Sequence, residues 1–195
     1  MPARWTSTSF PRSGDTDGTL VRRVLAGDRE AYASLVRRHQ AGLFRYARGL
    51  GIPPDPAEDL VQDAFIRAYH GLATCADPDR FEVWVFRILR NAALDFLKDI
   101  RRRSVSADAL PLRDPGPRPD DEAMRAELRR DLHDGLARLP TELRDAFLMK
   151  HLDGLSYEEM ADVTGASVSA LKMRVLRARD ALRETLAGRE AAGSM

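Results

Sequence analysis

The segment from residue 155 to residue 179 most narrowly limits the folds open to this chain, because it carries the signals of two short helices joined by a sharp turn. Ser156 and Glu159 have the spacing of a capping box, in which each side chain bonds a backbone N–H at the start of a helix. Gly165 supplies the left-handed residue that ends this helix, and Ser167 is placed to cap the next one. The segment therefore predicts a helix-turn-helix.

The second helix of this motif is expected to have an apolar face and a basic face. Residues at helical spacing form the apolar face, which is expected to face the core: Val168, Leu171, Val175, Ala178 and Leu182. The other side carries Ser169, Lys172, Met173, Arg174 and Arg177. An exposed cationic helix after a capped helix and a glycine turn is typical of motifs that place the second helix in the major groove of DNA. The alternative is an ordinary helical hairpin with a solvated basic face.

The rest of the chain shows helical periodicity and no strand pattern, so the sequence predicts an all-α fold. Two small helical domains are expected, at residues 18–103 and 122–187, joined by a flexible linker at 104–121. The linker has no periodic apolar residues and is marked by four prolines, Pro111, Pro115, Pro117 and Pro119. A disordered tail is expected at residues 1–17, and a small polar tail at 188–195.

Helix boundaries follow from caps and prolines. Asp28 is placed to cap a second helix, Pro56 lies near the start of a third, and Pro78 takes the first helical position of a fourth. The face of the fourth helix that is expected to be buried carries Phe81, Trp84, Ile88, Ala92 and Phe96. In the second domain, Pro140 begins a helix that Gly154 stops, and its expected core residues are Leu143, Phe147 and Leu148.

The formal net charge of +1 hides an uneven distribution of charge. Residues 167–183 contain five cations and one anion, whereas residues 55–63 contain four acids and no cation. Such asymmetry indicates one face for nucleic acid and another for a basic protein partner. The alternative for the acids is a helix N-terminus, where negative charge is favoured in any protein.

Several function classes find no support in the sequence. It shows no Gly-rich phosphate loop and no nucleophile–base constellation, so an enzyme is not expected. The four histidines lack metal-ligand spacing and Cys75 is the single cysteine, so no metal, cofactor or disulfide is expected. No apolar run reaches transmembrane length, and residues 1–18 lack the apolar core of a signal peptide, which predicts a soluble, cytoplasmic chain.

Three segments, in this order along the chain, resemble bacterial sigma factors. Asp59-Leu-Val-Gln-Asp-Ala-Phe-Ile-Arg-Ala-Tyr69 is similar to their polymerase-binding helix. Trp84-Val-Phe-Arg-Ile-Leu-Arg-Asn-Ala-Ala-Leu-Asp95 looks like their promoter-melting and −10-reading helix, and residues 139–179 look like their −35-reading domain. With two domains and a short linker, the chain resembles the extracytoplasmic-function (ECF) group of the sigma-70 family over about residues 18–186.

For polymerase binding, the resemblance implies that Asp59, Gln62, Asp63 and Ile66 contact the coiled coil of the largest polymerase subunit. The polymerase flap is implied as a further contact. The residues themselves support a protein contact, because an exposed isoleucine bordered by carboxylates and an amide suits a helix that carries basic residues. The buried stripe expected on the other side is Leu60, Val61, Ala64, Phe65, Ala68 and Leu72. The alternative is a solvated helix face.

For the −10 element, the resemblance implies that the non-template strand is held by Arg87, Arg90, Asn91 and Lys98. The loop at about residues 71–79 would form the rim of a pocket for an extruded base, since a stacked base hides its pairing edge. Trp84 is expected to pack in the core rather than to stack on DNA.

For the −35 element, the resemblance places base contacts at Ser169, Lys172, Met173 and Arg177. Lys172 is suited to donate to guanine acceptors. Arg174 and Arg179 are expected to bind phosphates or partners within the chain. Family members often carry a small residue in place of Met173, so the −35 sequence that this helix reads stays open.

The sequence therefore predicts a sigma factor that binds core RNA polymerase and directs promoter-specific initiation through −10 and −35 elements. The resemblance adds an anti-sigma factor as a further partner. The alternative is a stand-alone helix-turn-helix transcriptional regulator, which leaves the motifs of residues 55–99 unexplained. In the free protein the two domains are expected to close on each other or on an inhibitor and to hide both DNA surfaces.

Overall fold

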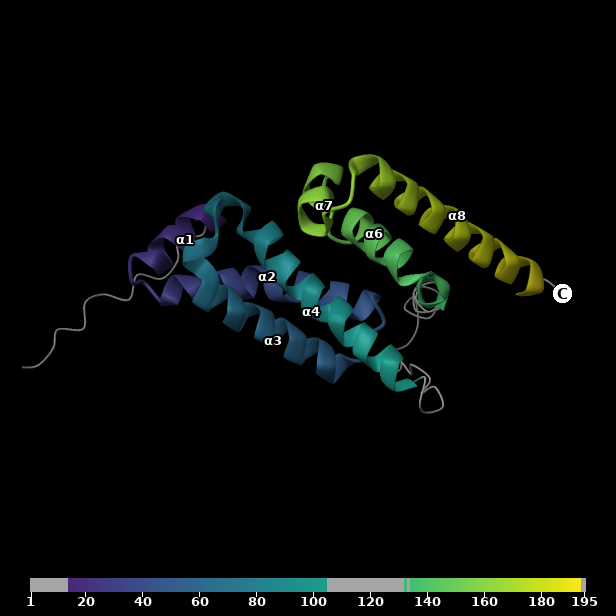
Figure 1. Ribbon diagram of the computed structural model, residues 1–195, viewed down its shortest axis with the longest axis horizontal. Coiled ribbons are helices and arrows are strands. Elements are labelled where there is room, and N and C mark those ends of the chain that lie inside the picture. Colours follow the sequence, from purple (N-terminus) through teal and green to yellow (C-terminus); the bar gives the residue numbers. More distant parts are fainter. Residues whose placement is uncertain (1–13, 105–131, 133, 194–195) are drawn as a thin grey trace, which may run out of the picture.

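The computed structural model describes residues 14–104, 132 and 134–193, which form helices and no strand (Figure 1). In chain order the elements are α1 (Asp17–Leu25), α2 (Glu30–Gly49), α3 (Pro54–Gly71), the short 3₁₀ turns η1 (Leu72–Thr74) and η2 (Pro78–Arg80), α4 (Phe81–Ser104), α6 (Thr141–His151), α7 (Tyr157–Thr164) and α8 (Val168–Gly193). Residues 105–121 of the linker expected at 104–121 and residues 1–13 of the tail expected at 1–17 lie outside the described residues. The described ends differ from these predictions, because α1 already begins at Asp17, α4 includes Ser104 and α8 continues to Gly193 within the tail expected at 188–195.

The first domain is a bundle of α1 to α4, in which α4 packs along α3 and α2 (Figure 1). Its core is closed to solvent: Leu35, Tyr46, Phe81 and Leu89 have no exposed surface. The stripe expected on α3 is confirmed, with Leu60 half-buried and the other members buried. Packing in this bundle holds α3 and α4 in place, so the outer face of α3 and the exposed side of α4 are rigid surfaces.

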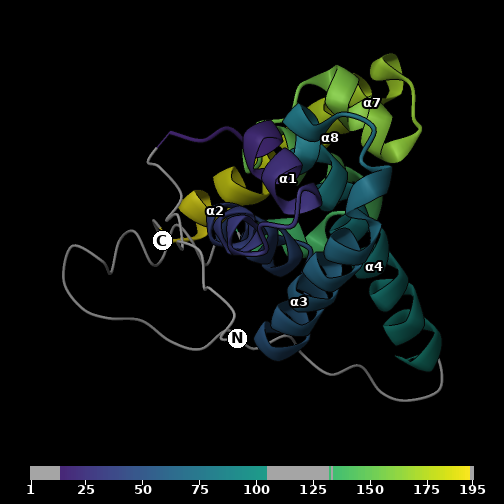
Figure 2. The same ribbon diagram turned by 90° about the vertical axis from the view of Figure 1, so that its left-hand side faces the viewer.

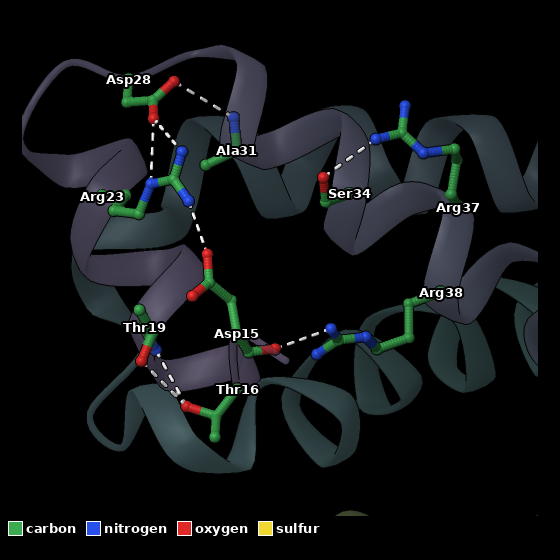
Figure 3. A network of polar contacts seen from close by, with 9 residues as sticks. All are labelled: Asp15, Thr16, Thr19, Arg23, Asp28, Ala31, Ser34, Arg37 and Arg38. Carbon is green, nitrogen blue, oxygen red and sulfur yellow. Dashed lines mark hydrogen bonds and ion pairs between the residues drawn. The ribbon is translucent and has the colours of Figure 1, made fainter. Parts of the chain in front are cut away.

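Polar contacts fix α1 against the start of α2 (Figure 3). The guanidinium of Arg23 lies 2.5 Å from the carboxylate of Asp15 and 2.6 Å from that of Asp28. Asp28 also accepts a hydrogen bond of 3.3 Å from the N–H of Ala31. Asp28 therefore caps α2 as predicted, although the helix begins at Glu30 and Arg29 takes the cap position.

The fourth helix differs from its prediction in two ways. Pro78 begins the 3₁₀ turn η2, which Asp77 caps by accepting from the N–H of Asp79 at 3.1 Å, and α4 starts at Phe81. The fully buried residues are Phe81, Val85, Phe86, Leu89 and Ala93, whereas Trp84, Ile88, Ala92 and Phe96 are half-buried. The expected face is confirmed at Phe81, and Trp84, Ile88 and Phe96 pack against the core while half-buried. The prediction missed the other fully buried residues, because α4 packs against α3 on one side and against α7 on another, so its apolar band is wider than one stripe.

The second domain contains the predicted helix-turn-helix. Ser156 accepts from the N–H of Glu159 at 3.1 Å, and the carboxylate of Glu159 accepts from the N–H of Ser156 at 2.8 Å, which completes the capping box of α7. Gly165 has a φ of 72°, and Ser167 accepts from the N–H of Ala170 at 3.2 Å. On α8, Leu171, Val175, Ala178 and Leu182 are buried and Val168 is half-buried, as expected.

The helix α6 precedes this motif with Pro140 as its cap residue. Leu148 is buried, as expected, while Leu143 and Phe147 are half-buried. Asp145, which periodicity did not assign to the core, is only 3% exposed. Gly154 has a φ of 69° just beyond the helix end.

The two domains pack against each other, with α6 on α2 and α7 on α4 (Figure 1, Figure 2). We call this arrangement the closed form. Gly49 permits a close approach, since a Cβ atom there would lie 2.8 Å from Cδ2 of Leu148. The guanidinium of Arg144 donates to the carbonyl oxygen of Leu50 at 2.7 Å, which adds a directional contact. Within the described residues, no helix is long and apolar enough to cross a membrane.

Candidate nucleic-acid and partner interfaces

The outer face of α3 brings together the predicted protein-binding residues. Asp59, Gln62, Asp63 and Ile66 are all exposed, and Ile66 leaves 48% of its surface open to solvent. Among the ion pairs of the described residues, none involves Asp59 or Asp63. This face thus offers uncompensated negative charge beside a large apolar side chain.

An apolar groove of about 680 Å³ runs between α2 and α3 beside this face. Gln62 and Ile66 form part of its wall, and its other residues include Tyr32, Val36, Phe44, Phe65 and Tyr69. Tyr32 is fixed there because its hydroxyl donates to the carbonyl oxygen of Phe65 at 2.5 Å. Burial raises the pKa of Tyr32, so this hydroxyl stays a donor. Tyr32, Val36 and Phe44 of α2 are half-buried along the groove.

The predicted −10 residues on α4 divide into two groups. Arg87, Asn91 and Lys98 are exposed, and the ammonium of Lys98 lies 2.9 Å from the carboxylate of Asp95. The side chain of Arg90, by contrast, is only 12% exposed and pairs with Asp145 of α6.

The carboxylate of Asp145 is held from two sides in the closed form. Nη2 and Nε of Arg90 donate to its Oδ2 at 2.5 and 3.0 Å. The hydroxyl of Tyr46 donates to its Oδ1 at 2.6 Å. Burial, together with the charge of Asp145, raises the pKa of Tyr46 well above its ordinary value, so the phenol remains protonated. Two residues of the first domain thus satisfy one buried carboxylate of the second.

The loop between α3 and α4 borders a hollow of about 290 Å³. From the first domain it is lined by residues that include Cys75, Arg80, Trp84 and Arg87; Asp162 and Val163 of α7 close the other side. Trp84 is half-buried, with its ring centroid 6.0 Å from that of Phe81, which agrees with the expected packing role.

Cys75 lies on the wall of this hollow without the features of a reactive thiol. Its Sγ donates to the carbonyl oxygen of Asp77 at 3.3 Å. Burial raises the pKa of the Cys75 thiol, which disfavours the thiolate. Among the described residues no three His, Cys, Asp or Glu side chains come together to hold a metal ion.

The basic side of α8 is open to solvent. Ser169, Lys172, Met173 and Arg177 are exposed, and Met173 leaves 47% of its surface free. Arg174 is half-buried and its guanidinium lies 3.4 Å from the carboxylate of Glu142 on α6. Arg179 lies 3.8 Å from its neighbour Asp180. Arg174 and Arg179 were expected to bind phosphates or partners within the chain, and both have such a partner within the chain.

Comparison with known proteins agrees with this division into two domains. Residues 35–103 match the family described as Sigma-70 region 2, and residues 129–182 match the family described as Sigma-70, region 4. The ECF RNA polymerase sigma-E factor of Haemophilus influenzae is 35% identical over 180 residues, which cover 85% of this chain and 92% of that protein. The sigma-E factor of Escherichia coli K12 is 33% identical over 177 residues, covering 86% of this chain and 92% of that protein.

Two solved structures share the fold. CnrH, in complex with the cytosolic domain of CnrY, matches with a TM-score of 0.68 and 34% identity, covering 89% of this chain and 99% of that chain. The sigma factor RpoE from Bartonella quintana, in complex with the anti-sigma factor NepR, matches with a TM-score of 0.67 and 26% identity, covering 80% of this chain and 96% of that chain.

Proposed function

Since this chain belongs to the ECF group of the sigma-70 family and is a sigma factor that directs promoter-specific transcription initiation, we propose that three separate surfaces carry out that function. The outer face of α3 binds core polymerase, α4 with the loop before it binds the −10 element, and α8 reads the −35 element. The observation that supports this division most strongly is the separation of charge. Unpaired carboxylates lie on α3 of one domain, and an exposed cationic face lies on α8 of the other.

For the α3 face, the chemistry fits a basic helix such as the coiled coil of the largest polymerase subunit. Ile66 gives the contact an apolar centre next to the groove, and Asp59 and Asp63 give it a charged rim. Interfaces of this kind gain orientation and association rate from the rim and affinity from the buried apolar anchor. A contact of the second domain with the polymerase flap belongs to the same proposal.

For the −10 element, Arg87, Asn91 and Lys98 offer donors along the exposed side of α4. The hollow beside Trp84 is where an extruded base would enter, and Arg87 lies on its wall. Arg90 joins this surface only after Asp145 releases it, because both Nε and Nη2 are used in the closed form.

For the −35 element, Lys172 is the principal base reader, with guanine as its preferred partner. Ser169 and Arg177 add polar contacts, and Met173 offers an apolar contact of the kind that suits a thymine methyl group. Arg174 holds α8 against α6 through its ion pair with Glu142, and its contact with DNA is to a phosphate and not to a base.

An anti-sigma factor is the remaining partner. The related RpoE was solved in complex with the anti-sigma factor NepR. We extend this to the present chain as a proposal, since the exposed α3 face and its groove leave room for a protein competitor of the polymerase.

The test of the α3 assignment is charge reversal. Asp63→Arg should weaken association with purified core polymerase about tenfold or more, because it places like charges opposite each other. The helical circular dichroism signal should not change, since the site is exposed. Glu30→Arg, another exposed acid of the first domain, is the matched control and should bind as the wild type does. Equal affinities for all three proteins would move the polymerase interface away from α3.

A further inference from the structure

We infer that α1 is a brace for the loop between α3 and α4, and that Gly18, Arg22 and Asp79 are positioning residues that set which base this loop accepts in the −10 element. None of these three residues lines the hollow beside Trp84. The inference rests on the proposed −10 assignment and names the residues that give its loop a fixed shape.

The loop between α3 and α4 presents different residues on its two sides. On one side, Thr74, Cys75, Ala76, Asp77 and Arg80 line the hollow where an extruded base would enter. On the other side, η1 and η2 pack against α1, which lies at the same end of the bundle (Figure 1). The helix α1 therefore supports the loop from behind, away from the surface proposed for DNA.

Asp79 is the residue of η2 through which the loop meets α1. Its carboxylate lies 2.7 Å from the guanidinium of Arg22. The same carboxylate occupies the space beside Gly18, where a Cβ atom would lie only 1.9 Å from Oδ1 and 2.5 Å from Cγ of Asp79. Gly18 is in the first turn of α1, where the positive end of the helix favours a carboxylate. The absence of a side chain at Gly18 is therefore what lets the loop lie so close to the helix.

The helix α1 is itself fixed on the bundle, so it gives the loop a firm support. Leu20 and Val21 have no exposed surface. The carboxylate of Asp17 lies 2.7 Å from Nε2 of His39 and also pairs with Arg38, both of which belong to α2. These contacts do not involve the loop, so α1 keeps its place when the other side of the loop binds DNA.

Hydrogen bonds within the loop connect Asp79 to the wall of the hollow. The N–H of Asp79 donates to the side chain of Asp77 at 3.1 Å, and the N–H of Arg80 donates to the carbonyl oxygen of Asp77 at 3.0 Å. Sγ of Cys75 donates to the same carbonyl oxygen at 3.3 Å. A shift of Asp79 therefore moves Asp77 and its neighbours on the hollow. Such a shift changes which base fits, because an extruded base is read by closely placed groups.

The contact between Asp79 and α1 adds little to stability, which separates a positioning role from a structural one. The side chains of Arg22 and Asp79 are 59% and 57% exposed, and ion pairs so open to solvent contribute little to the free energy of unfolding. Alanine at Gly18 is favoured by helix propensity, and the nearest atoms that its Cβ meets belong to the exposed Asp79 side chain. Substitutions at these positions should therefore leave the fold intact and change where the loop lies.

The test uses holoenzyme assembled from core polymerase and the full chain. Gly18→Ala pushes the Asp79 carboxylate aside, Asp79→Ala removes it, and a third variant combines the two changes. Gly42→Ala is the matched control, since a Cβ there has only Nη2 of Arg45 at 4.0 Å. Transcription in vitro is compared on fragments that carry each base in turn at every −10 and −35 position of one promoter that the wild-type holoenzyme transcribes.

Each single variant should lower the preference for the favoured base at one or two −10 positions by at least about fivefold. The double variant should lose no more than either single variant, because Gly18→Ala acts through Asp79. The −35 preferences are an internal control. The basic side of α8 is exposed in the closed form, so the expectation that closure hides both DNA surfaces is not met. These preferences and the free energy of unfolding should match the wild type, as should every value for Gly42→Ala.

A −10 ranking that is unchanged in both single variants would overturn the inference. Additive losses in the double variant, or losses that extend to the −35 preferences or to the free energy of unfolding, would overturn it as well, since they indicate a general structural role. A separate arm tests the −10 assignment with Arg87→Ala, which should lower transcription from every fragment. If Arg87→Ala transcribes as the wild type does, the proposed −10 surface is wrong. If it transcribes more weakly while the α1 variants keep the wild-type ranking, only the brace is wrong.

Discussion

Asp153 should make the closed form sensitive to pH in the neutral range. It lies just after α6, at a hollow of about 270 Å³ between the domains. Its Oδ2 is buried without a hydrogen-bond partner among the described residues. Burial raises the pKa of Asp153 from 3.8 to about 7, against a smaller opposing effect of Arg45 and with a small addition from Glu82. Arg38 and His39 of α2 line the same hollow.

The direction of the effect follows from the two pKa values. When the domains separate, solvent reaches the carboxyl and its pKa should return to about its ordinary value. Between about pH 4 and pH 7, closing the domains therefore takes up a proton, and the closed form loses stability as the pH rises through this range. Above pH 7 the penalty is constant. The pKa values of Asp153 in the closed and open forms differ by about three units, so the free energy of closure changes by at most about 4 kcal/mol across this range. The ratio of closed to open molecules therefore falls by up to about tenfold per unit of pH.

The assay compares the wild type with Asp153→Asn, whose amide stays neutral at every pH. We expect the radius of gyration of the wild type to increase between pH 5.5 and pH 8, and that of Asp153→Asn to change much less. Acidic groups with lowered pKa values do not interfere. The hydrogen bond from Arg23 lowers the pKa of Asp28, so the stabilising effect of that carboxylate is lost only at still lower pH.

A matched control is Asp180→Asn, which removes an exposed carboxylate of α8. It should follow the wild type. Parallel pH curves for the wild type and Asp153→Asn would refute the reasoning, because Asp153 would then contribute nothing to the pH dependence.

Three further predictions concern −35 recognition, the turn and the linker. Lys172→Ala should reduce the free energy of binding to the cognate −35 element by about 1–3 kcal/mol and relax the sequence preference at one or two base pairs. Arg174→Ala should instead weaken binding to all DNA sequences alike and lower the salt dependence of binding. An unchanged ranking of −35 variants in Lys172→Ala would exclude it as a base reader. Gly165→Ala, at a φ of 72°, should lower the free energy of unfolding by about 1–2 kcal/mol in denaturant melts, and no loss would show that the turn relaxes. Cleavage at a protease site inserted between Asp114 and Asp120 should abolish transcription in vitro through loss of effective concentration, and full activity of the cut protein would show that the tether contributes nothing.

Local chemistry explains why the helix-turn-helix could be predicted. The capping box of Ser156 and Glu159 and the left-handed Gly165 act within a few residues, so their consequences do not depend on distant packing. The outer face of α3 was equally accessible to prediction, because one bundle buries one stripe of the helix and exposes Asp63 and Ile66 opposite.

Packing between segments far apart in sequence explains what could not be predicted. Arg90 has the spacing of an exposed residue on α4, but Asp145, 55 residues away, covers it in the closed form. Asp145 itself gave no signal, since an aspartate in an amphipathic helix is ordinarily placed on the solvent side. The groove that Tyr32, Val36 and Phe44 line also could not be predicted, because it depends on how α2 packs beside α3. Gly49 likewise has meaning only once Leu148 is in place.

The central claim is that this chain selects promoters as a subunit of polymerase and not as a free regulator. The most direct measurement is transcription in vitro with purified core polymerase on fragments of the source genome, with 5′ ends mapped in the presence and absence of the chain. We predict new start sites that share two upstream elements at a fixed spacing, that depend on the chain, and that disappear with Asp63→Arg. Start sites that do not depend on the chain, or shared elements that it protects equally well without polymerase, would contradict the account.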